Sequence, residues 1–213
     1  MQNTKRKSAA IRREEIAVAA LRIIGERGIA SLTTTTLAEE VGVTSGALFR
    51  HFKSREEMLQ EAARHALAKI ESTFPDPTLA PLERLLALAE NRVRIVGADP
   101  GVAWVLRSEQ AYLSLPPDAV DRLRDLVRRS KRFVLTALRD GSADGTIRTD
   151  IAPETLFVPV MGTIHALIGM AGIHATAGRT KGSSAARVLA ALAVLLTPPD
   201  GVPGDSEPIP PEC

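Results

Sequence analysis

Two short candidate helices, joined by a tight turn at Gly42, are the feature that most constrains what this chain can fold into. The first is expected over residues 34–41, because Thr33 can cap it by accepting a hydrogen bond from a free backbone N–H. The second is expected to begin at Thr44 or at Ser45, since either hydroxyl can act as its cap. Helices of about two turns bury too little surface to serve as scaffold, so the second is either a connector or is presented to a partner.

Longer helices are predicted on both sides of this pair. Residues 9–27 carry apolar side chains at the spacing of one helix face, and Gly28 can end that helix in the left-handed conformation. On the other side, Ser54 and Glu57 form a capping box that starts a helix reaching about Phe74. Two short helices joined by a tight turn form a helix-turn-helix. The residues expected in the core of this motif are Ile16, Ile23, Leu37, Val41, Leu48 and Phe52.

The rest of the chain is also predicted to be helical. Aromatic residues make up only 3% of the chain, and its abundant Ala and Leu favour helix over sheet. A proline-rich break at 74–81 follows the first four helices, and turn-forming residues separate the later ones. The predicted fold class is all-α with about nine helices, the last five at about 81–98, 100–113, 117–142, 153–177 and 183–197.

Positive charge is concentrated in the first third of the chain. Residues 1–70 hold 12 Lys and Arg against 8 Asp and Glu, whereas the remainder holds 15 against 17. The basic residues that cluster at the start can form either a solvated, frayed terminus or an arm that faces phosphates. This cluster consists of Lys5, Arg6, Lys7, Arg12 and Arg13.

Several classes of protein are disfavoured by what the sequence lacks. No apolar run follows the basic amino terminus and no apolar stretch reaches about 18 residues, so neither a secretory signal nor a membrane span is expected. The single cysteine, Cys213, cannot form a disulfide framework, and a cytoplasmic location is the default expectation. His165 and His174 fall on opposite faces of one helix, so no metal site is predicted. No phosphate-binding loop or nucleophile motif is present, so no catalytic residue, cofactor or enzyme activity is predicted.

The second short helix is predicted to run to His51 and to leave one face free. The face opposite Leu48 and Phe52 carries Thr44, Ser45, Ala47, Arg50 and His51. Small residues at the start of a helix let it enter the major groove of DNA, and Arg50 and His51 can donate to phosphates or to guanine edges. The alternatives are that Arg50 pairs with a glutamate and that His51 packs at the end of the helix.

The segment LTTTTLAEEVGVTSGALFRHFKSREEML resembles the DNA-binding segment of the TetR/AcrR family of bacterial transcriptional regulators. The resemblance covers about residues 10–65 without gaps, and its most specific part is GVTSGALFRHFKSREEML. It implies an all-α homodimer, whose N-terminal three-helix domain reads a pseudo-palindromic operator in double-stranded DNA. It also implies a larger C-terminal domain that dimerises and holds a small-molecule pocket. Most members repress transcription, and the ligand releases the DNA.

The resemblance and the helix pattern together predict five segments along the chain. They are a flexible basic arm at 1–8, a helix-turn-helix DNA-binding domain at 9–53, a connecting helix at 54–74, a C-terminal ligand-binding and dimerisation domain at 75–197 and a disordered proline-rich tail at 198–213.

The resemblance also implies which residues contact DNA. In the family, the start of the helix at 34–41 faces a phosphate, where free N–H groups and the helix dipole favour an anion. Ser45 stands where members often have Lys or Arg, and Phe49 stands where the family usually has Tyr. Phe49 is expected to keep the packing of that ring and to lose a phosphate hydrogen bond worth about 0.5–1.5 kcal/mol per half-site. The predicted contacts are Thr33, Thr34, Thr35, Thr44, Ser45, Gly46, Phe49, Arg50, His51, Lys53 and Arg55.

Two further sites are predicted in the C-terminal domain. The helices at 153–177 and 183–197 are apolar or small on nearly every face, so we expect them to form a four-helix interface between two chains. Its predicted residues are Gly162, Ala166, Gly169, Ile173, Ala186, Ala190 and Ala193. A pocket for a hydrophobic or amphipathic effector has as its candidate lining residues Trp104, Tyr112, Phe133, Met161 and His165.

The sequence favours a repressor that an effector releases from DNA, and it leaves two alternatives open. One is a TetR-like interaction or regulatory module with weakened operator binding, which Ser45 and Phe49 support. The other is an activator, because nothing in the sequence predicts the sign of regulation. The operator sequence and the identity of the effector are not predicted either.

Overall fold

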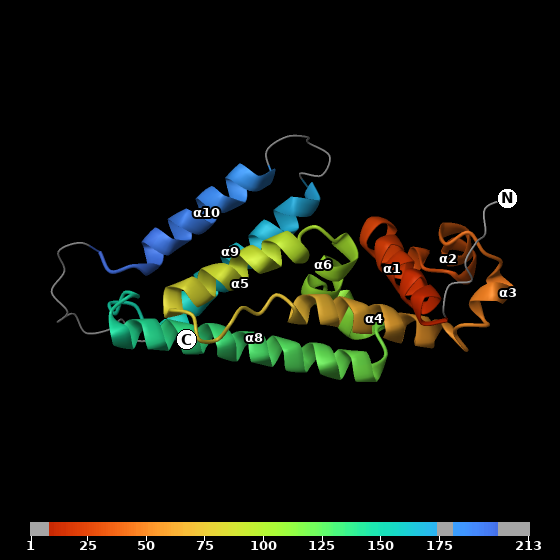
Figure 1. Cartoon of the computed structure of the whole chain (residues 1–213), viewed down its shortest axis with the longest axis horizontal. Coiled ribbons are helices and arrows are strands. Elements are labelled where there is room, and N and C mark those ends of the chain that lie inside the picture. The colour runs from red at the N-terminus through yellow and green to blue at the C-terminus, as the bar shows by residue number, and fades with distance from the viewer. Residues whose placement is uncertain (1–8, 174–180, 200–213) are drawn as a thin grey trace. The chain divides into compact units, whose positions relative to one another are not determined.

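The computed structural model describes residues 9–173 and 181–199, so the predicted basic arm at 1–8, His174 and most of the proline-rich tail lie outside them. The described residues are helical and include no strand, which confirms the all-α class (Figure 1). Within these residues, no helix is both long enough and apolar enough to cross a membrane.

The described residues form one more α-helix than the sequence predicts. The predicted helix at 100–113 is two helices, because Ser108 has an extended backbone that ends the first, and its hydroxyl caps the second by accepting from Gln110 N at 3.2 Å. A short 3-10 helix that the sequence did not predict follows Gly28. The elements are α1 (Ala9–Arg27), η1 (Ile29–Ser31), α2 (Thr34–Glu40), α3 (Ser45–Leu48), α4 (Arg55–Glu71), α5 (Pro81–Ile95), α6 (Pro100–Arg107), α7 (Glu109–Ser114), α8 (Pro117–Asp144), α9 (Pro153–Ile173) and α10 (Lys181–Leu196).

Packing divides the chain into two compact units. The amino-terminal unit comprises the residues up to Ile70 together with Asp99–Arg124, and the carboxy-terminal unit comprises Glu71–Ala98 together with the residues from Asp125 onward. This division differs from the predicted segment borders, because α6 packs against α1 and next to α7. The five functional segments therefore stay a prediction.

Close helix packing shapes the amino-terminal unit. A Cβ atom built on Gly101 would lie 2.1 Å from the carbonyl oxygen of Leu21, and one on Gly25 would lie 2.4 Å from Gly101 N. Both glycines are therefore required where α1 crosses α6. Val41 was predicted in the core but is only half-buried, because it lies just after the end of α2 at the turn. The other predicted core residues are fully buried: Ile16, Ile23, Leu37, Leu48 and Phe52.

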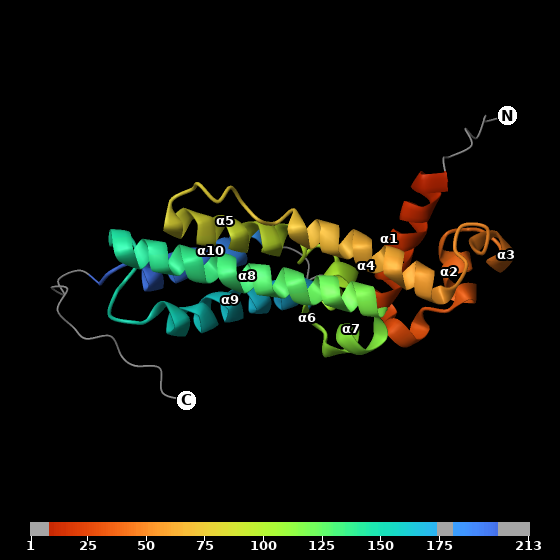
Figure 2. The same ribbon diagram turned by 90° about the horizontal axis from the view of Figure 1, so that it is seen from below.

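The carboxy-terminal unit is a helical bundle. Helices α5, α9 and α10 pack on one another, and α8 runs beside α5 (Figures 1 and 2). Polar side chains join α5 to α8, since Arg84 pairs with Asp140 and Arg92 donates to Ser130. The apolar residues of α8 that face this bundle include Val134 and Leu138, both fully buried.

Candidate DNA-binding site

The turn between α2 and α3 is held by local hydrogen bonds that its sequence encodes. The Thr33 hydroxyl caps α2, as predicted, by accepting from Thr36 N at 3.1 Å. Gly42 has a φ of +68°, a left-handed conformation that glycine adopts without strain. The chain then turns back, and Val43 N donates to Ala38 O at 2.9 Å. Thr33 and Thr35 are exposed and Thr34 is half-buried.

The second short helix is shorter than predicted. Of the two candidate caps, Thr44 is the one used, because its hydroxyl accepts from Ala47 N at 3.2 Å. Helix α3 covers only Ser45–Leu48, and the residues up to Phe52 continue as turns in which His51 N donates to Leu48 O at 2.9 Å. The recognition segment, defined as residues 44–53, is therefore one helical turn followed by a tight hydrogen-bonded turn.

The recognition segment is anchored through two side chains and exposes most others. Leu48 and Phe52 are fully buried, as predicted. Thr44, Gly46 and Arg50 are exposed, and a Cβ on Gly46 would meet no atom within 4 Å. The remaining predicted contact residues of the segment are half-buried Ser45 and His51 and exposed Lys53.

Phe49 does not keep the packing that was expected of its ring. It is 50% exposed, because it follows the last residue of α3 on the side away from buried Leu48. An aromatic ring in this position adds an apolar patch to a surface that is otherwise polar.

Arg13 holds the end of the recognition segment to α1 and α4. Its Nη1 atom donates to the carbonyl oxygen of His51 and to Oε1 of Glu57, the latter at 2.9 Å. The guanidinium also lies over the ring of Phe52, 4.2 Å from the ring centroid. The expectation that Arg13 belongs to a frayed or phosphate-facing arm is wrong, because its donors face protein acceptors. Its position three residues before Ile16, on the apolar face of α1, is the signal that could have identified it.

Arg12 and the remaining members of the basic cluster have different outcomes. Arg12 pairs with Glu15 at 3.0 Å on the surface of α1. Lys5, Arg6 and Lys7 lie outside the described residues, so the basic arm stays a prediction.

Glu57 organises the start of α4. The Ser54 hydroxyl accepts from Glu57 N at 3.1 Å, which confirms Ser54 as the cap. The Glu57 carboxylate accepts from Lys53 N at 2.6 Å, one residue earlier than a standard capping box requires. That backbone hydrogen bond, followed by the Arg13 guanidinium, lowers the pKa of Glu57 below its ordinary value. Glu57 is therefore ionised at neutral pH, and it fixes the loop that carries Lys53.

Arg50 and Arg55, near the recognition segment, differ in how far protein contacts already occupy their guanidinium groups. Arg50 has no ion-pair partner among the described residues, so the predicted alternative of a glutamate partner is not observed there. Arg55 is partly engaged, since its Nε donates to Leu32 O at 3.2 Å and ties the start of α4 to the residue before the Thr33 cap of α2. Arg55 as a whole is exposed.

The five predicted pocket residues do not gather in one unit. Trp104 is half-buried and Tyr112 is 37% exposed, both in the amino-terminal unit. Phe133, Met161 and His165 are half-buried in the carboxy-terminal unit, and Phe133 lines a pocket there.

The predicted interface residues are largely uncovered in the single chain. Gly162, Ala166, Ala186 and Ala190 are exposed, Gly169 and Ala193 are half-buried, and the side chain of Ile173 lies outside the described set. Large apolar residues on the same two helices are also exposed, to 68% for Val158, 74% for Val194 and 63% for Leu195. Helices α9 and α10 therefore present apolar surface that this chain does not bury.

Comparison with known proteins agrees with this geometry. Residues 16–62 match the family model of bacterial regulatory proteins, tetR family. One relative is the HTH-type transcriptional repressor KstR2 of Mycolicibacterium smegmatis, which is 26% identical over 151 residues, 70% of this chain and 73% of the relative.

Solved structures show the same fold over most of the chain. The ketosteroid transcriptional regulator KstR2 of Mycobacterium tuberculosis has a TM-score of 0.71 at 23% identity and covers 87% of this chain and 95% of its own. AibR in complex with isovaleryl coenzyme A and operator DNA has a TM-score of 0.71 at 19% identity and covers 88% of this chain and 99% of its own. Residues 16–62 thus carry a helix-turn-helix of the kind found in bacterial regulatory proteins of the tetR family, and the chain is similar to the repressor KstR2 and shares the fold of these solved regulators.

Proposed function

We propose that this chain is a sequence-specific DNA-binding transcriptional regulator, and specifically a repressor that a small effector releases from its operator. The observation that carries the proposal is the recognition segment. It is one capped helical turn that is buried through Leu48 and Phe52 and fastened at its end by Arg13. A helix this short contributes little as scaffold, and its exposed side has the size and polarity that suit a major groove.

The predicted DNA contacts follow from this placement. Thr44, Ser45 and Gly46 enter the groove, and the open space in front of Gly46 permits close approach of base edges. Arg50 and His51 donate to phosphates or to guanine. Phosphates on either side are contacted by Lys53 and Arg55 and by the hydroxyls at the start of α2, those of Thr33, Thr34 and Thr35.

We propose that the functional form is a homodimer joined through α9 and α10. Its support is the uncovered apolar surface of these helices, on which the small residues Gly162 and Ala166 allow close helix approach. Two copies present two recognition segments, and successive major grooves on one side of a duplex lie about 34–36 Å apart. A pseudo-palindromic operator follows from that symmetry. In this arrangement residues 9–53 read DNA, 54–74 connect, and 75–197 dimerise and bind the effector.

The effector is proposed to be a small apolar or amphipathic molecule. The AibR structure of the same fold contains isovaleryl coenzyme A together with operator DNA. A coenzyme A thioester is therefore the first class of effector to test on this chain.

Fluorescence anisotropy with the full chain tests the proposal. Labelled duplexes from the intergenic DNA beside the chain's own gene are compared with shuffled duplexes of the same composition at two salt concentrations. Binding to the intergenic duplex is expected to be tighter by about a thousandfold or more and to survive an excess of shuffled competitor. Equal affinity for both duplexes would contradict sequence-specific regulation and favour the interaction-module alternative. A promoter–reporter fusion then separates a repressor from an activator.

A further inference from the structure

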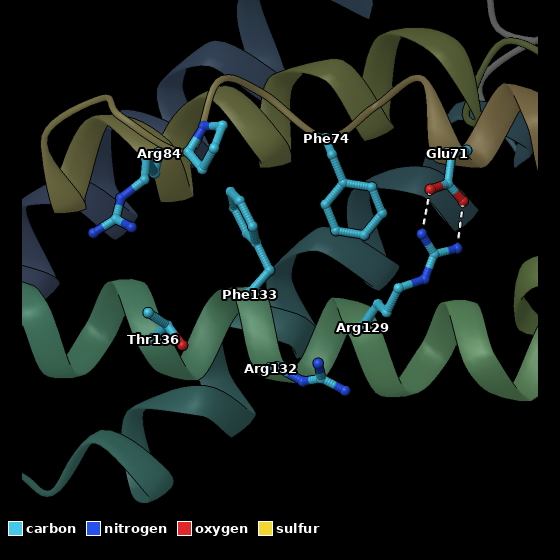
Figure 3. Close-up of a pocket in the computed structure, with 8 residues that line it drawn as sticks. Glu71, Phe74, Arg84, Arg129, Arg132, Phe133 and Thr136 are labelled. Atoms are coloured by element: carbon cyan, nitrogen blue, oxygen red, sulfur yellow. Dashed lines mark hydrogen bonds and ion pairs between the residues drawn. The ribbon is translucent and has the colours of Figure 1, made fainter.

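One pocket lies wholly within the carboxy-terminal unit, between α8, the start of α5 and the segment that follows α4. Its volume is about 360 Å³, within the range of small-molecule sites. The rings of Phe74 and Phe133 meet edge to face at its centre, with centroids 5.4 Å apart (Figure 3). Pro77 adds to this apolar wall, and charged side chains stand around it. The pocket thus has an apolar centre and a charged rim.

The rim carries more positive than negative charge. Arg129 forms a two-pronged pair with Glu71, in which Nη2 and Oε2 are 2.5 Å apart (Figure 3). Arg84 pairs with Asp140 at 2.6 Å. Arg132 also lines the pocket and has no ion-pair partner among the described residues. Each carboxylate near the rim is therefore paired with one arginine, and Arg132 adds a positive charge that no carboxylate of the described residues balances.

A second uncompensated arginine lies behind the apolar wall. Arg92 is 1% exposed, and its guanidinium carbon is 5.5 Å from the centroid of Phe74. Its Nη2 donates to the Ser130 hydroxyl at 2.6 Å and its Nε to the Thr73 hydroxyl at 3.4 Å, and no carboxylate within the described part of the chain pairs with it. Burial lowers the pKa of Arg92 to about 10, so it is still charged at neutral pH. A buried cation without a counter-charge makes the space in front of Phe74 favourable for an anion.

The rim also contains an unused buried donor. The Nε atom of Arg84 is buried and has no hydrogen-bond acceptor among the described residues, although Nη2 of the same side chain is paired. Leaving such a donor unpaired costs free energy that a ligand oxygen can recover. This is an observation independent of the charge count, and it concerns the same cavity.

We infer that this pocket binds an amphipathic anion, with an apolar chain or ring against Phe74 and Phe133 and a carboxylate or phosphate group held by Arg129 and Arg132. The apolar part gains contact with the two rings and Pro77. The anionic group meets two guanidinium groups, whose planar donors suit carboxylate and phosphate oxygens. Free carboxylates and coenzyme A thioesters both supply this chemistry, one through its acid group and the other through its phosphates.

Binding changes the partner of Glu71. The ligand anion competes with Glu71 for Arg129, so the two-pronged pair opens when the pocket fills. Glu71 is the last residue of α4, the helix that begins directly after the recognition segment. The pair is therefore a contact through which the ligand can act on the end of α4, and this consequence rests on the proposed regulatory function.

Isothermal titration calorimetry on the full chain tests the site with three probes: octanoate, octanoyl coenzyme A and 1-octanol. At least one anionic probe is expected to bind about tenfold or more tightly than 1-octanol, which shares the chain but lacks the charge. Binding by octanoate identifies a carboxylate site, and binding by octanoyl coenzyme A alone identifies a phosphate site. If neither anion binds, or if the alcohol binds equally well, the inference is wrong.

Two matched variants assign the binding to this pocket. Arg132→Ala is expected to weaken the anionic probe by about tenfold, whereas Arg128→Ala, on the same helix but paired with Asp125 outside the pocket, leaves it unchanged. Equal affinities in the two variants would overturn the assignment.

Operator affinity is measured separately without probe. A chain that binds no specific DNA yet binds octanoate contradicts the proposed function and leaves the site standing, and the reverse result contradicts the site alone.

Discussion

Arg13 and Arg92 occupy similar places in the two units, and their surroundings differ. Each projects from the apolar face of its helix, Arg13 three residues before buried Ile16 on α1 and Arg92 four residues after buried Leu88 on α5. Arg13 meets the carboxylate of Glu57 and a backbone carbonyl. The Arg92 guanidinium donates only to hydroxyl groups in the described part of the chain.

Arg13 therefore acts as a structural anchor, whereas Arg92 is a source of positive charge inside its unit. The charge of Arg13 is neutralised locally, so its contribution lies in holding the recognition segment in one geometry. The charge of Arg92 is not neutralised, so it destabilises the carboxy-terminal unit unless an anion binds nearby. An arginine on the apolar face of a helix thus holds the recognition segment rigid in the amino-terminal unit. In the carboxy-terminal unit, an arginine in the same kind of place favours the binding of an anionic ligand.

The largest effect is expected from Arg92→Ala. Truncation leaves a cavity in the bundle and removes the donors that reach Ser130 and Thr73, so the free energy of unfolding should fall by about 3 kcal/mol. Urea unfolding of the full chain, followed by circular dichroism, measures it. Arg92→Met fills most of the space without a buried charge and should lie within about 1 kcal/mol of the natural chain. If Arg92→Met loses as much unfolding free energy as Arg92→Ala, the charge of Arg92 stabilises the unit. That result would contradict the view that this charge is destabilising.

Arg13→Ala tests whether Arg13 anchors the recognition segment. Removing its bonds to His51 O and to Glu57 should lower the free energy of unfolding by about 1–2 kcal/mol. Operator affinity should fall by more than this change in stability explains, because the end of the recognition segment loses its anchor. The matched control is Arg12→Ala, whose half-buried surface pair with Glu15 is worth less than about 0.5 kcal/mol. Unaltered operator affinity in Arg13→Ala, measured by anisotropy below its unfolding range, would remove Arg13 from the site.

The local features of the recognition segment were predictable, because they depend on residues close in sequence. The Thr33 and Ser54 caps and the turn at Gly42 each involve atoms no more than five residues apart. The break at Ser108 was missed although it is local, since the apolar spacing continues across it. Val127 lies one helical turn after fully buried Leu123 on α8 and is still 40% exposed, because helical period alone does not say where a neighbouring helix stops.

The two arginines could not be assigned from the sequence for a different reason. Arg13 finds its acceptors 38 and 44 residues away, and Arg92 finds Ser130 38 residues away. Which partner such a residue meets depends on how helices cross. Arg13 was assigned to a frayed or phosphate-facing arm, and no role was predicted for Arg92. Their positions on apolar faces were visible, so a charged residue inside an apolar stripe is the signal to follow.

Phe49→Tyr probes the exposed side of the recognition segment with a smaller change. Since Phe49 is half exposed, an added hydroxyl extends into the space where a phosphate is proposed. Affinity should rise by about 0.5–1.5 kcal/mol per half-site, on operator and shuffled duplexes alike, because a phosphate contact carries no sequence information. Phe49→Leu keeps an apolar side chain and should give no gain. Unchanged or weaker binding in Phe49→Tyr would mean that the ring faces away from the duplex.

The smallest effect is expected from acidification, through His65 on α4. Burial is the main cause that lowers the pKa of His65 below its ordinary value of 6.5, with nearby Lys69 adding to it and Glu14 opposing it. Its Nε2 atom is buried without a hydrogen-bond partner among the described residues. Because the unfolded chain takes up the proton first, the stability associated with neutral His65 is present above pH 6.5 and is lost as pH falls from there toward the lowered pKa.

His65→Leu separates this step from the titration of carboxylates. The variant cannot take up the proton, so its urea midpoint should change less than that of the natural chain between pH 7.5 and pH 5.5. Both proteins should lose further stability below pH 4.5, where Glu57, whose pKa is lowered by Lys53 and Arg13, gains its proton in the unfolded chain before the folded one. An identical response of the two proteins above pH 5.5 would show that His65 takes up its proton as easily in the folded chain as in the unfolded one. Such a result would show that the burial of His65 does not contribute to the pH dependence of stability.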